Sequence, residues 1–383
     1  MQDVAIIGMG QTPVGEHWQL GLRDLGADAA RAALADSGLE TVDTLIVANA
    51  FGPTISSQSH VAPLIADFAG LRGVETYTVE AAEGSGGAAL RAGIQAIRSG
   101  DASTVMVLGV EKATDMIGTA RTRARGVSVD ADDESVHGAT LTALAALLMR
   151  RYMYEYGVDL AAFEGFSINS HANGAKNANA MYRNTIKPGA FSRAPMIADP
   201  ISLFDNAPDA DGAAAVILTT PERAQDLVPH PVRIIGGGAA SDSLTLGERD
   251  DLLWLRAVEI STERALRSAS VAREQINLIE LTDSFAIMAT LSLEASGFAA
   301  RGEGWRLSQD GTIGLTGRLP VSTFGGLKSR GNPVGASGVY QAVEAALQLR
   351  QTAGPNQVPN AQIAMIQSVG GLGSTAFTHI LAL

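Results

Sequence analysis

The order of apolar runs and helical patterns along this 383-residue sequence occurs twice, and this duplication restricts the possible folds more than any other feature. Each half begins with an apolar run, a helical pattern and a second apolar run, at residues 4–7, 22–37 and 44–47 and again at 232–235, 252–268 and 276–281. Gly38 stands where a glycine commonly ends a helix. Because strand–helix–strand units build parallel sheets covered by helices, the sequence predicts an α/β fold of two similar halves.

The repeated order continues further along each half. A helical pattern and an apolar run follow in both, at residues 86–98 and 104–108 and again at 335–350 and 363–366. We expect one half-domain over 1–225 and a second over 226–383. The first includes an insertion, at about residues 111–205, which contains a helical pattern over 141–156 and polar loops. Long ordered loops above an α/β scaffold tend to form lids over binding sites.

Composition excludes several classes of protein. The chain is 46% hydrophobic and 18% charged, so it can bury a large core and is not disordered. Its formal net charge of −12 repels phosphate backbones, and we expect no nucleic acid partner. With no cysteine and only six scattered histidines, the sequence contains no disulfide framework, no thiol nucleophile and no pattern of metal ligands.

The sequence contains no pattern typical of membrane insertion or secretion. Asp3 stands where a signal peptide requires positive charge, and the apolar run that follows it is short. No run of eighteen apolar residues is long enough to span a bilayer. We therefore expect a cytoplasmic protein without a membrane span.

The segment VEAAEGSGGAALRAG, residues 79–93, is the strongest candidate for a chemical site. An apolar strand ends there, a turn of small residues follows, and a helix begins near Ser85, where free amides and the helix dipole favour negative charge. Glu83 occupies that turn, either as a simple cap or as a general base. Burial can raise a carboxyl pKa by about 3–5 units, whereas the helix dipole lowers it by about one unit. In a dry pocket Glu83 would therefore titrate near neutrality.

Three further segments lie at corresponding strand ends. LTDSF contains Thr282 and Asp283, and Asp283 is expected mainly to anchor a loop. The glycine-rich GGLKSRGNPVGASG contains Lys328 and Arg330 as candidate phosphate contacts, although its spacing matches neither a Walker nor a Rossmann pattern. QSVGGLGST, residues 367–375, provides a second set of free amides. Because ligands of open α/β sheets bind beyond the carboxyl ends of the strands, we expect these segments to share one site.

These motifs resemble the thiolase superfamily, in particular its sterol-carrier-protein type and the related lipid-transfer and aldolase branch. The resemblance extends over nearly the whole chain through AIIGMGQTPVG, VEAAEGSGGAALRAG, RRYMYEYG, PMIADPISLFD, PDADGAAAV, LTDSF, GRLPVSTFGGLKSRGNPVGASG and QSVGGLGST. It implies a five-layer αβαβα arrangement of two duplicated half-domains, assembly into dimers or tetramers, and binding of acyl-CoA thioesters. It implies no cofactor beyond the coenzyme A of the substrate.

The sequence departs from this family at all four positions that carry its usual chemistry. Glu83 replaces the nucleophilic cysteine, Thr282 and Asn332 each replace a histidine, and Ser368 replaces an asparagine or cysteine. The surrounding glycines remain, so we expect that the cavity persists while the covalent acyl-enzyme route is lost. The resemblance makes these four residues the catalytic candidates, with backbone amides near Gly84 and Gly371 as oxyanion donors.

The resemblance favours one enzymatic hypothesis, retro-aldol cleavage of a 3-hydroxyacyl-CoA without a covalent intermediate. Glu83 would accept the proton of the β-hydroxyl, and the amides together with Asn332 would stabilise the enolate. Thiolase-like aldolases of steroid side-chain degradation are similar, and they pair with a small zinc-ribbon/OB-fold protein. Because those aldolases rely on active-site tyrosines, Tyr340 is a candidate substrate contact.

Two alternatives remain open at this point. One is a non-catalytic subunit that binds acyl-CoA or lipid, since four catalytic positions changed together. The other is an acetyl-CoA acetyltransferase in which Ser85 acts as the nucleophile, although no histidine stands in the matching motifs to activate it. His137, in the insertion, either reaches the pocket or lies on the surface.

Three alternating arginines and one aspartate complete the sequence predictions. Arg121, Arg123 and Arg125 are candidates for contact with CoA phosphates or, equally, for a solvated or subunit-interface face. Asp211, in PDADGAAA, is expected to hold a turn.

Overall fold

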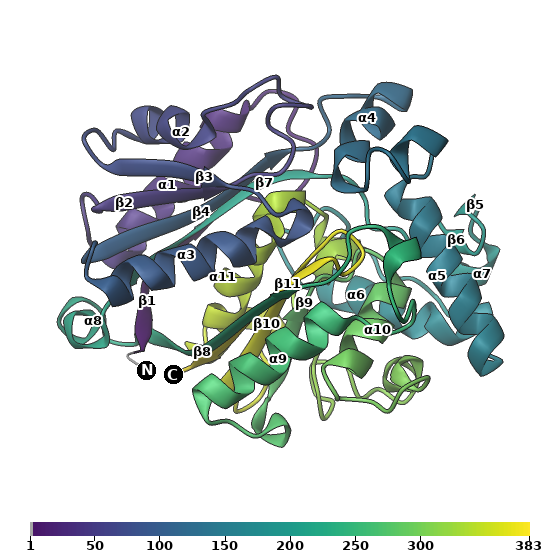
Figure 1. Ribbon diagram of the computed structural model, residues 1–383. Coiled ribbons are helices and arrows are strands. Elements are labelled where there is room, and N and C mark those ends of the chain that lie inside the picture. Colours follow the sequence, from purple (N-terminus) through teal and green to yellow (C-terminus); the bar gives the residue numbers. More distant parts are fainter. Residues whose placement is uncertain (1–2) are drawn as a thin grey trace.

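Nine strands form one hydrogen-bonded sheet in the computed structural model, which describes residues 3–383 (Figure 1). Across the sheet the strands run in the order β3-β2-β4-β7-β1-β8-β11-β10-β9. The strands are β1 (Val4–Gln11), β2 (Thr44–Ala48), β3 (Glu75–Val79), β4 (Thr104–Lys112), β7 (Asp211–Thr219), β8 (Val232–Ser241), β9 (Leu278–Leu281), β10 (Ile363–Gly370) and β11 (Thr375–Ala382). The remaining two, β5 (Met196–Ala198) and β6 (Ile201–Ser202), pair separately.

The two halves of the sheet repeat one topology. In the first half β1 is antiparallel to β7 and β7 to β4, whereas β4, β2 and β3 are mutually parallel. In the second half β8 is antiparallel to β11 and β11 to β10, whereas β10 is parallel to β9. A parallel bridge between Ile279 and Val321 stands where β3 stands in the first half. Short antiparallel pairing of β1 with β8 joins the halves. The repeated order of the strands confirms the predicted fold of two similar halves.

Helices form three layers around the two half-sheets (Figure 1). On the outer face of the first half lie α1 (Leu22–Ser37) and α2 (Val61–Ala69), and α9 (Arg256–Ala269) covers β8 and β11 of the second. Between the half-sheets lie α3 (Ser85–Ser99), which contacts β4 and β11, and α11 (Ser337–Leu349), which contacts β7 and β10. The arrangement is the predicted five-layer αβαβα fold.

The two inner helices meet at their N-terminal turns. Each is preceded by a short 3₁₀ turn, Ala82–Gly84 before α3 and Val334–Ala336 before α11. A β-carbon added to Gly86 would lie only 2.7 Å from the Cα atom of Gly338, so neither position has room for a side chain. The glycines therefore bring both helix N-termini to the centre of the molecule, where the candidate site lies.

Glycines inside two strands correct the sequence prediction. The apolar runs of the sequence end at residues 7 and 235, each directly before a glycine, yet β1 and β8 both continue through the glycines. A β-carbon on Gly8 would lie 2.4 Å from the carbonyl oxygen of Ala33 in α1, and one on Gly238 would lie 2.1 Å from that of Ser261 in α9. These glycines allow each outer helix to pack directly on its strand.

The insertion packs as a group of helices at the end of the molecule far from both chain termini (Figure 1). Its helices are α4 (Gly118–Arg125), α5 (Leu141–Tyr156), α6 (Glu164–Gly174) and α7 (Ala190–Arg193), and the short α8 (Pro221–Leu227) follows β7. The sequence predicted the bounds of α1 and α5 correctly. No helix among residues 3–383 is both long enough and apolar enough to cross a bilayer.

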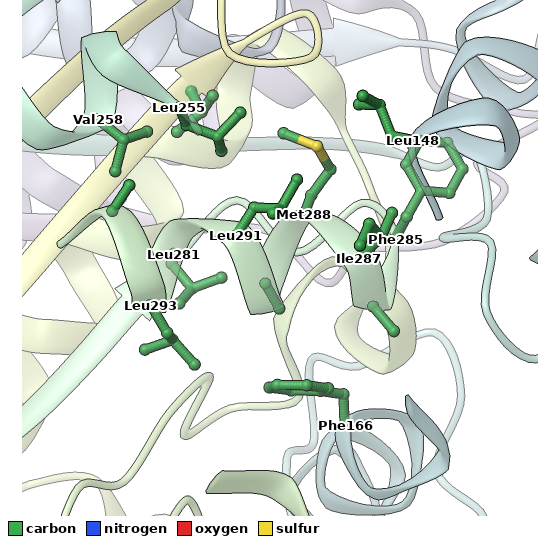
Figure 2. Close-up of a cluster of buried hydrophobic side chains, with 14 of the residues drawn as sticks. Leu148, Phe166, Leu255, Val258, Leu281, Phe285, Ile287, Met288, Leu291 and Leu293 are labelled. Carbon is green, nitrogen blue, oxygen red and sulfur yellow. The ribbon is translucent and has the colours of Figure 1, made fainter. Parts of the chain in front are cut away.

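A large apolar cluster fixes the insertion to the second half of the molecule. Every residue of α10 (Ala286–Ala295) is buried, as expected for a helix that is apolar on all sides. Figure 2 shows its side chains among those of Leu148 from α5, Phe166 from α6 and Val258 from α9. Burial of this size holds the inserted helices firmly, so the residues that they contribute to the site are well positioned.

Candidate active site

Glu83 lies in the turn between β3 and α3, at the meeting point of the two inner helices. Its predecessor Ala82 has a φ angle of 51°, a left-handed conformation that is costly for alanine and directs the next side chain away from the helix. The Glu83 side chain is only 1% exposed. Its Oε2 atom accepts a hydrogen bond of 3.0 Å from the backbone N–H of Gly371, in the turn between β10 and β11.

The second carboxylate oxygen of Glu83 has no hydrogen-bond partner among the described residues. Its ion-pair partner is Arg125, whose Nη2 atom lies 3.7 Å from Oε1. Burial raises the pKa of Glu83, whereas the Arg125 charge and the Gly371 N–H act in the opposite direction. Burial is the largest of these effects, so Glu83 is a carboxyl group that gains a proton more readily than an exposed one.

Arg125 is the last residue of α4 and stands between Glu83 and an open hollow. Its Nη1 atom forms an ion pair with Asp209, and its guanidinium carbon lies 5.7 Å from the centre of the Phe51 ring. Asp209 also forms an ion pair with Arg121, whose Nε atom lies 3.2 Å from Oδ2 of Asp209. The insertion thus delivers a fixed positive group to the buried carboxylate.

The hollow has a volume of about 600 Å³, within the range of small-molecule sites. It is lined by the insertion, by the loop before β7, by the end of the loop that leads into α10, and by the loop before α11. Its polar and charged lining residues are Thr119, Arg121, Thr122, Arg123, Arg125, Ser135, Thr140, Thr142, Asn206, Asp209, Ser284 and Asn332. Three arginines among them favour an anionic ligand.

Of the four catalytic candidates only Asn332 lines the hollow, since Glu83 lies behind Arg125 and does not border it. Its Oδ1 atom accepts hydrogen bonds from the backbone N–H of Val334 at 3.0 Å and from the hydroxyl of Ser337 at 3.2 Å, which fixes the turn before α11. Its backbone forms a bridge with that of Asp209. The structure therefore places Asn332 beside the Arg125–Asp209 pair.

Thr282 and Ser368 lie near this centre but are engaged in internal hydrogen bonds. The Thr282 hydroxyl donates to the carbonyl of Gln367 at 3.3 Å and accepts from the N–H of Val369 at 3.0 Å. The Ser368 hydroxyl donates to Oε1 of Gln341 at 2.9 Å. Both side chains are buried and neither lines the hollow, so the contacts support roles in joining β9, β10 and α11.

The predicted oxyanion donors are also engaged. The N–H of Gly84 donates to the carbonyl of Ala81 at 2.9 Å, and the N–H of Gly371 is bound to Glu83 itself. The Ser85 hydroxyl donates to the carbonyl of Ala82 at 2.6 Å and accepts from the N–H of Ala81 at 2.8 Å. Ser85 thus closes the turn, which leaves it poorly suited to attack a thioester.

The structure does not bring the other three predicted substrate contacts to the hollow. Lys328 donates to the carbonyls of Leu203 and Asn206, each at 2.8 Å, and burial lowers its pKa to about 8. Tyr340 is fully buried, and its hydroxyl donates to the carbonyl of Thr12 at 2.9 Å. His137 is exposed and borders a separate hollow beside α5.

Sequence reasoning missed Glu111, a buried carboxylate at the end of β4. It accepts hydrogen bonds of 2.9–3.1 Å from the backbone N–H groups of Ala50, Phe51 and Gly335. Burial raises its pKa to about 7, against these donors and the nearby Arg125 charge. A charged residue after the apolar run VMVLGV was the signal that could have identified it.

Two aspartates behave as the sequence suggested. Asp211 accepts from Nζ of Lys112 at 2.7 Å and from the N–H of Thr114 at 2.9 Å, and so anchors the chain after β4. Asp283 accepts from the hydroxyl of Ser322 and the N–H of Leu327, and so holds the glycine-rich loop. Among residues 3–383 no three His, Cys, Asp or Glu side chains are grouped in a way that could hold a metal ion.

Comparison with known proteins identifies the class. The N-terminal domain of thiolases matches residues 4–195, and the description "Thiolase C-terminal domain-like" matches residues 238–383. The chain belongs to the thiolase family, of the kind that the sequence motifs indicated. It is a thiolase-like protein related to acyl-CoA enzymes.

Two sequence relatives and one solved structure show which members of the family this chain is similar to. An acetyl-CoA acetyltransferase of Methanothermobacter thermautotrophicus is 38% identical over 384 residues and covers all of both chains. Sterol carrier protein 2 of Bos taurus is 26% identical over 93% of this chain and 67% of its own length. Among solved structures, the Ltp2-ChsH2(DUF35) aldolase superposes with a TM-score of 0.86 at 25% identity, covering 100% of this chain and 98% of the other.

Proposed function

We propose that this protein cleaves 3-hydroxyacyl-CoA thioesters by a retro-aldol reaction, with Glu83 as the general base. The observation that carries the proposal is the state of the Glu83 carboxylate. It is buried, one oxygen is fixed by the Gly371 N–H, and the other has no hydrogen-bond partner among the described residues. A fixed carboxylate with one unused oxygen and a raised pKa is suited to accept a proton from the substrate.

The reaction requires no group beyond the substrate and the protein. Oε1 of Glu83 takes the proton of the β-hydroxyl, the bond between Cα and Cβ breaks, and Cβ leaves as an aldehyde or ketone. The electron pair moves onto the thioester oxygen as an enolate. The protonated Glu83 then returns the proton to Cα, which gives the shortened acyl-CoA and restores the carboxylate.

Acyl transfer is less compatible with this site, although an archaeal relative is named acetyl-CoA acetyltransferase. The chain contains no cysteine, and an acyl group on Glu83 would be a reactive anhydride. Ser85 is occupied in the turn. The relationship to an aldolase in structure supports carbon–carbon cleavage instead.

The non-catalytic alternative also has an observation in its favour. Arg125 lies between Glu83 and the hollow, so the Arg125–Glu83 ion pair could instead have a structural role in a subunit that binds acyl-CoA or lipid. The two candidates differ in one measurable respect, because only the lyase releases a carbonyl product.

We expect the protein, purified from its own host so that any bound subunit is retained, to release an aldehyde or ketone from at least one 3-hydroxyacyl-CoA. The panel should include short-chain, long-chain and steroidal esters, with products identified by mass spectrometry. Intact-mass spectra after incubation with acetyl-CoA should show no stable added acetyl group. A stable acetyl group on the peptide that contains residues 83 and 85 would support the acyltransferase. CoA ester binding without carbonyl release would support the scaffold.

A partner subunit belongs to the same proposal. The solved aldolase bears a two-component name, which supports association of this chain with a DUF35-type protein, of the small zinc-ribbon/OB-fold kind expected from sequence. The assay on native-host protein tests this directly, since a co-purifying subunit would be identified by mass.

The proposed assembly also includes a homodimer formed through β3. This strand is at the edge of the sheet and pairs only with β2, and its Tyr77 side chain is 38% exposed. The N–H of Glu75 points to β2, where it bonds to the carbonyl of Asp43, so the alternating N–H of Thr76 points outward.

Proline at Thr76 is therefore expected to weaken the dimer without disturbing the pairing of β3 with β2, because proline is tolerated at sheet edges and removes only the outward donor. Light scattering across a concentration series should give a dissociation constant raised at least about tenfold, since each 1.4 kcal/mol corresponds to a factor of ten. Thr76→Ser keeps the donor and serves as the control. An unchanged dissociation constant for Thr76→Pro would contradict this interface.

A further inference from the structure

Retro-aldol cleavage places negative charge on the thioester oxygen, and this charge requires a donor within the site. The two backbone amides expected to serve are already engaged. Gly84 donates to Ala81, and Gly371 donates to the catalytic candidate Glu83. Engagement of these amides leaves the side chains at the border of the hollow, Asn332 and the arginines, as the available donors.

Arg125 is the cation nearest to the proposed base. Its Nη2 atom lies 3.7 Å from Oε1 of Glu83, which is an ion-pair distance but too long for a hydrogen bond. Its side chain is 22% exposed and lines the hollow, whereas Glu83 is 1% exposed behind it. A thioester that enters the hollow therefore approaches Glu83 past this guanidinium.

Three contacts hold Arg125 in that position, two to its guanidinium and one to its backbone. Asp209 binds the Nη1 side of the fork, and the Phe51 ring lies 5.7 Å from the guanidinium carbon. The backbone carbonyl of Arg125 accepts a hydrogen bond of 2.9 Å from the hydroxyl of Ser128, which fixes the end of α4. Because one side of the planar group is anchored, the Nη2 side is presented to the reacting atoms without reorganisation.

We propose that Arg125 is a catalytic residue that stabilises the enolate oxyanion by donating from Nη2 to the thioester oxygen, a role that rests on the proposed retro-aldol function. As the β-hydroxyl proton moves to Oε1 of Glu83, the carbon–carbon electron pair moves to the thioester oxygen. One negative charge leaves the Glu83 carboxylate while one appears on the substrate. The guanidinium exchanges one anionic neighbour for the other, so the net charge of the site stays constant.

The charges around Arg125 favour this exchange. Asp209 is shared by Arg121 and Arg125, so these two cations face two carboxylates, Asp209 and Glu83. The group of four is neutral while Glu83 is ionised, and it is neutral again when Glu83 is protonated and an enolate is bound. A protein site that needs no change in net charge stabilises the transition state without moving solvent.

The test compares Arg125→Gln, Arg125→Lys and Arg125→Ala with wild type and with Arg72→Gln, a matched change in the exposed ion pair that Arg72 forms with Asp67. Two activities are measured: carbonyl release from a 3-hydroxyacyl-CoA, and exchange of the Cα hydrogens of acetyl-CoA in D₂O. Exchange needs the enolate but no carbon–carbon cleavage. Circular dichroism verifies that each variant is folded. If Arg125→Gln does not fold, Arg125→Lys is compared with wild type in its place.

We expect Arg125→Gln to lower kcat for cleavage and the rate of exchange by about 100-fold or more, the usual cost of losing one oxyanion donor, with KM changed less than about threefold. Arg125→Lys should be intermediate because it keeps the charge but loses the planar fork. Added guanidinium should restore part of the activity of Arg125→Ala, and Arg72→Gln should match wild type.

Two outcomes would overturn the role of Arg125 while leaving the lyase function in place. One is active wild type with unchanged kcat in Arg125→Gln, and the other is an effect confined to KM, which would make Arg125 a binding group for the CoA ester. A wild-type protein that neither cleaves nor exchanges would instead overturn the proposed function, and the inference with it.

Discussion

Replacement of Glu83 by glutamine is expected to lower kcat/KM for cleavage of a 3-hydroxyacyl-CoA by about 10²–10⁴-fold, the usual contribution of a positioned general base. Glutamine has nearly the same shape, and its carbonyl oxygen can still accept the hydrogen bond from the Gly371 N–H. It cannot accept a proton from the β-hydroxyl. The loss should therefore appear in the chemical step while CoA ester binding, measured by calorimetry, stays within about threefold of wild type.

The pH dependence gives a second measure of the same residue. Glu83 acts in its deprotonated form, and burial raises its pKa above the ordinary value of 4.5. Activity should thus rise with pH through the folded-state pKa of Glu83, and the acidic limb of the kcat/KM profile should lie above pH 4.5. This limb should disappear from the residual activity of Glu83→Gln. In Arg125→Gln it should move to higher pH, because the cation that lowers the pKa of Glu83 is gone.

Glu80→Gln provides the matched control in the same turn. The Glu80 side chain is exposed, and its Oε1 atom accepts a hydrogen bond of 2.6 Å from the N–H of Ala82, which glutamine can also accept. Its activity and its pH profile should therefore remain close to those of wild type. Full activity in Glu83→Gln would exclude Glu83 as the base.

The sequence predicted the fold well because the duplicated order of strands and helices is encoded locally. It predicted the ends of β1 and β8 less well, since the apolar runs end before Gly8 and before the three glycines that include Gly238. Their actual use depends on the carbonyls of Ala33 and Ser261, which only the tertiary structure brings near. Close packing between distant segments leaves no signature in a local sequence window.

The same distinction applies to the candidate site. Glu83 and Gly371 follow strands β3 and β10, and Asn332 precedes the inner helix α11, so their convergence could be predicted from the order of the elements. The pairing of Arg125 with Asp209 could not, because it depends on how the insertion folds back over the loop before β7. Lys328 and Tyr340 were misplaced for a related reason, since their polar atoms find backbone carbonyls in the interior rather than a ligand.

A buried cluster of charges lies behind the site, between β9 and α11. Nη1 of Arg330 is 2.7 Å from Oε2 of Glu344, and the two side chains are 2% and 1% exposed. Glu280 and Asp283 are buried nearby, so three carboxyl groups surround one guanidinium. Burial and the Glu344 charge hold the pKa of Glu280 well above its ordinary value, so we expect Glu280 to bind a proton more readily than Glu344, whose carboxylate is paired with Arg330.

The two glutamates of this cluster should therefore respond in opposite ways to the same substitution. Glu344→Gln leaves the Arg330 charge buried without its ionic partner and is expected to cost about 3 kcal/mol or more of unfolding free energy. Glu280→Gln replaces a carboxyl group whose charged form burial and the Glu344 charge disfavour, and its carbonyl oxygen can still accept the 2.9 Å hydrogen bond from the N–H of Thr323. It should be neutral or stabilising at pH 7.

The pH dependence of stability distinguishes this account from simple loss of packing. A carboxyl group whose pKa is raised by folding contributes stability below its unfolded value of 4.5, and this contribution is lost as pH rises toward the folded pKa. Wild type should lose stability over that window, and Glu280→Gln should lose less, so that the advantage of the variant grows with pH. Urea unfolding of both variants and wild type at several pH values above 4.5 would measure the difference. Equal destabilisation by both substitutions at every pH would show that Glu280 and Glu344 carry the same charge, which contradicts the assignment of the proton to Glu280.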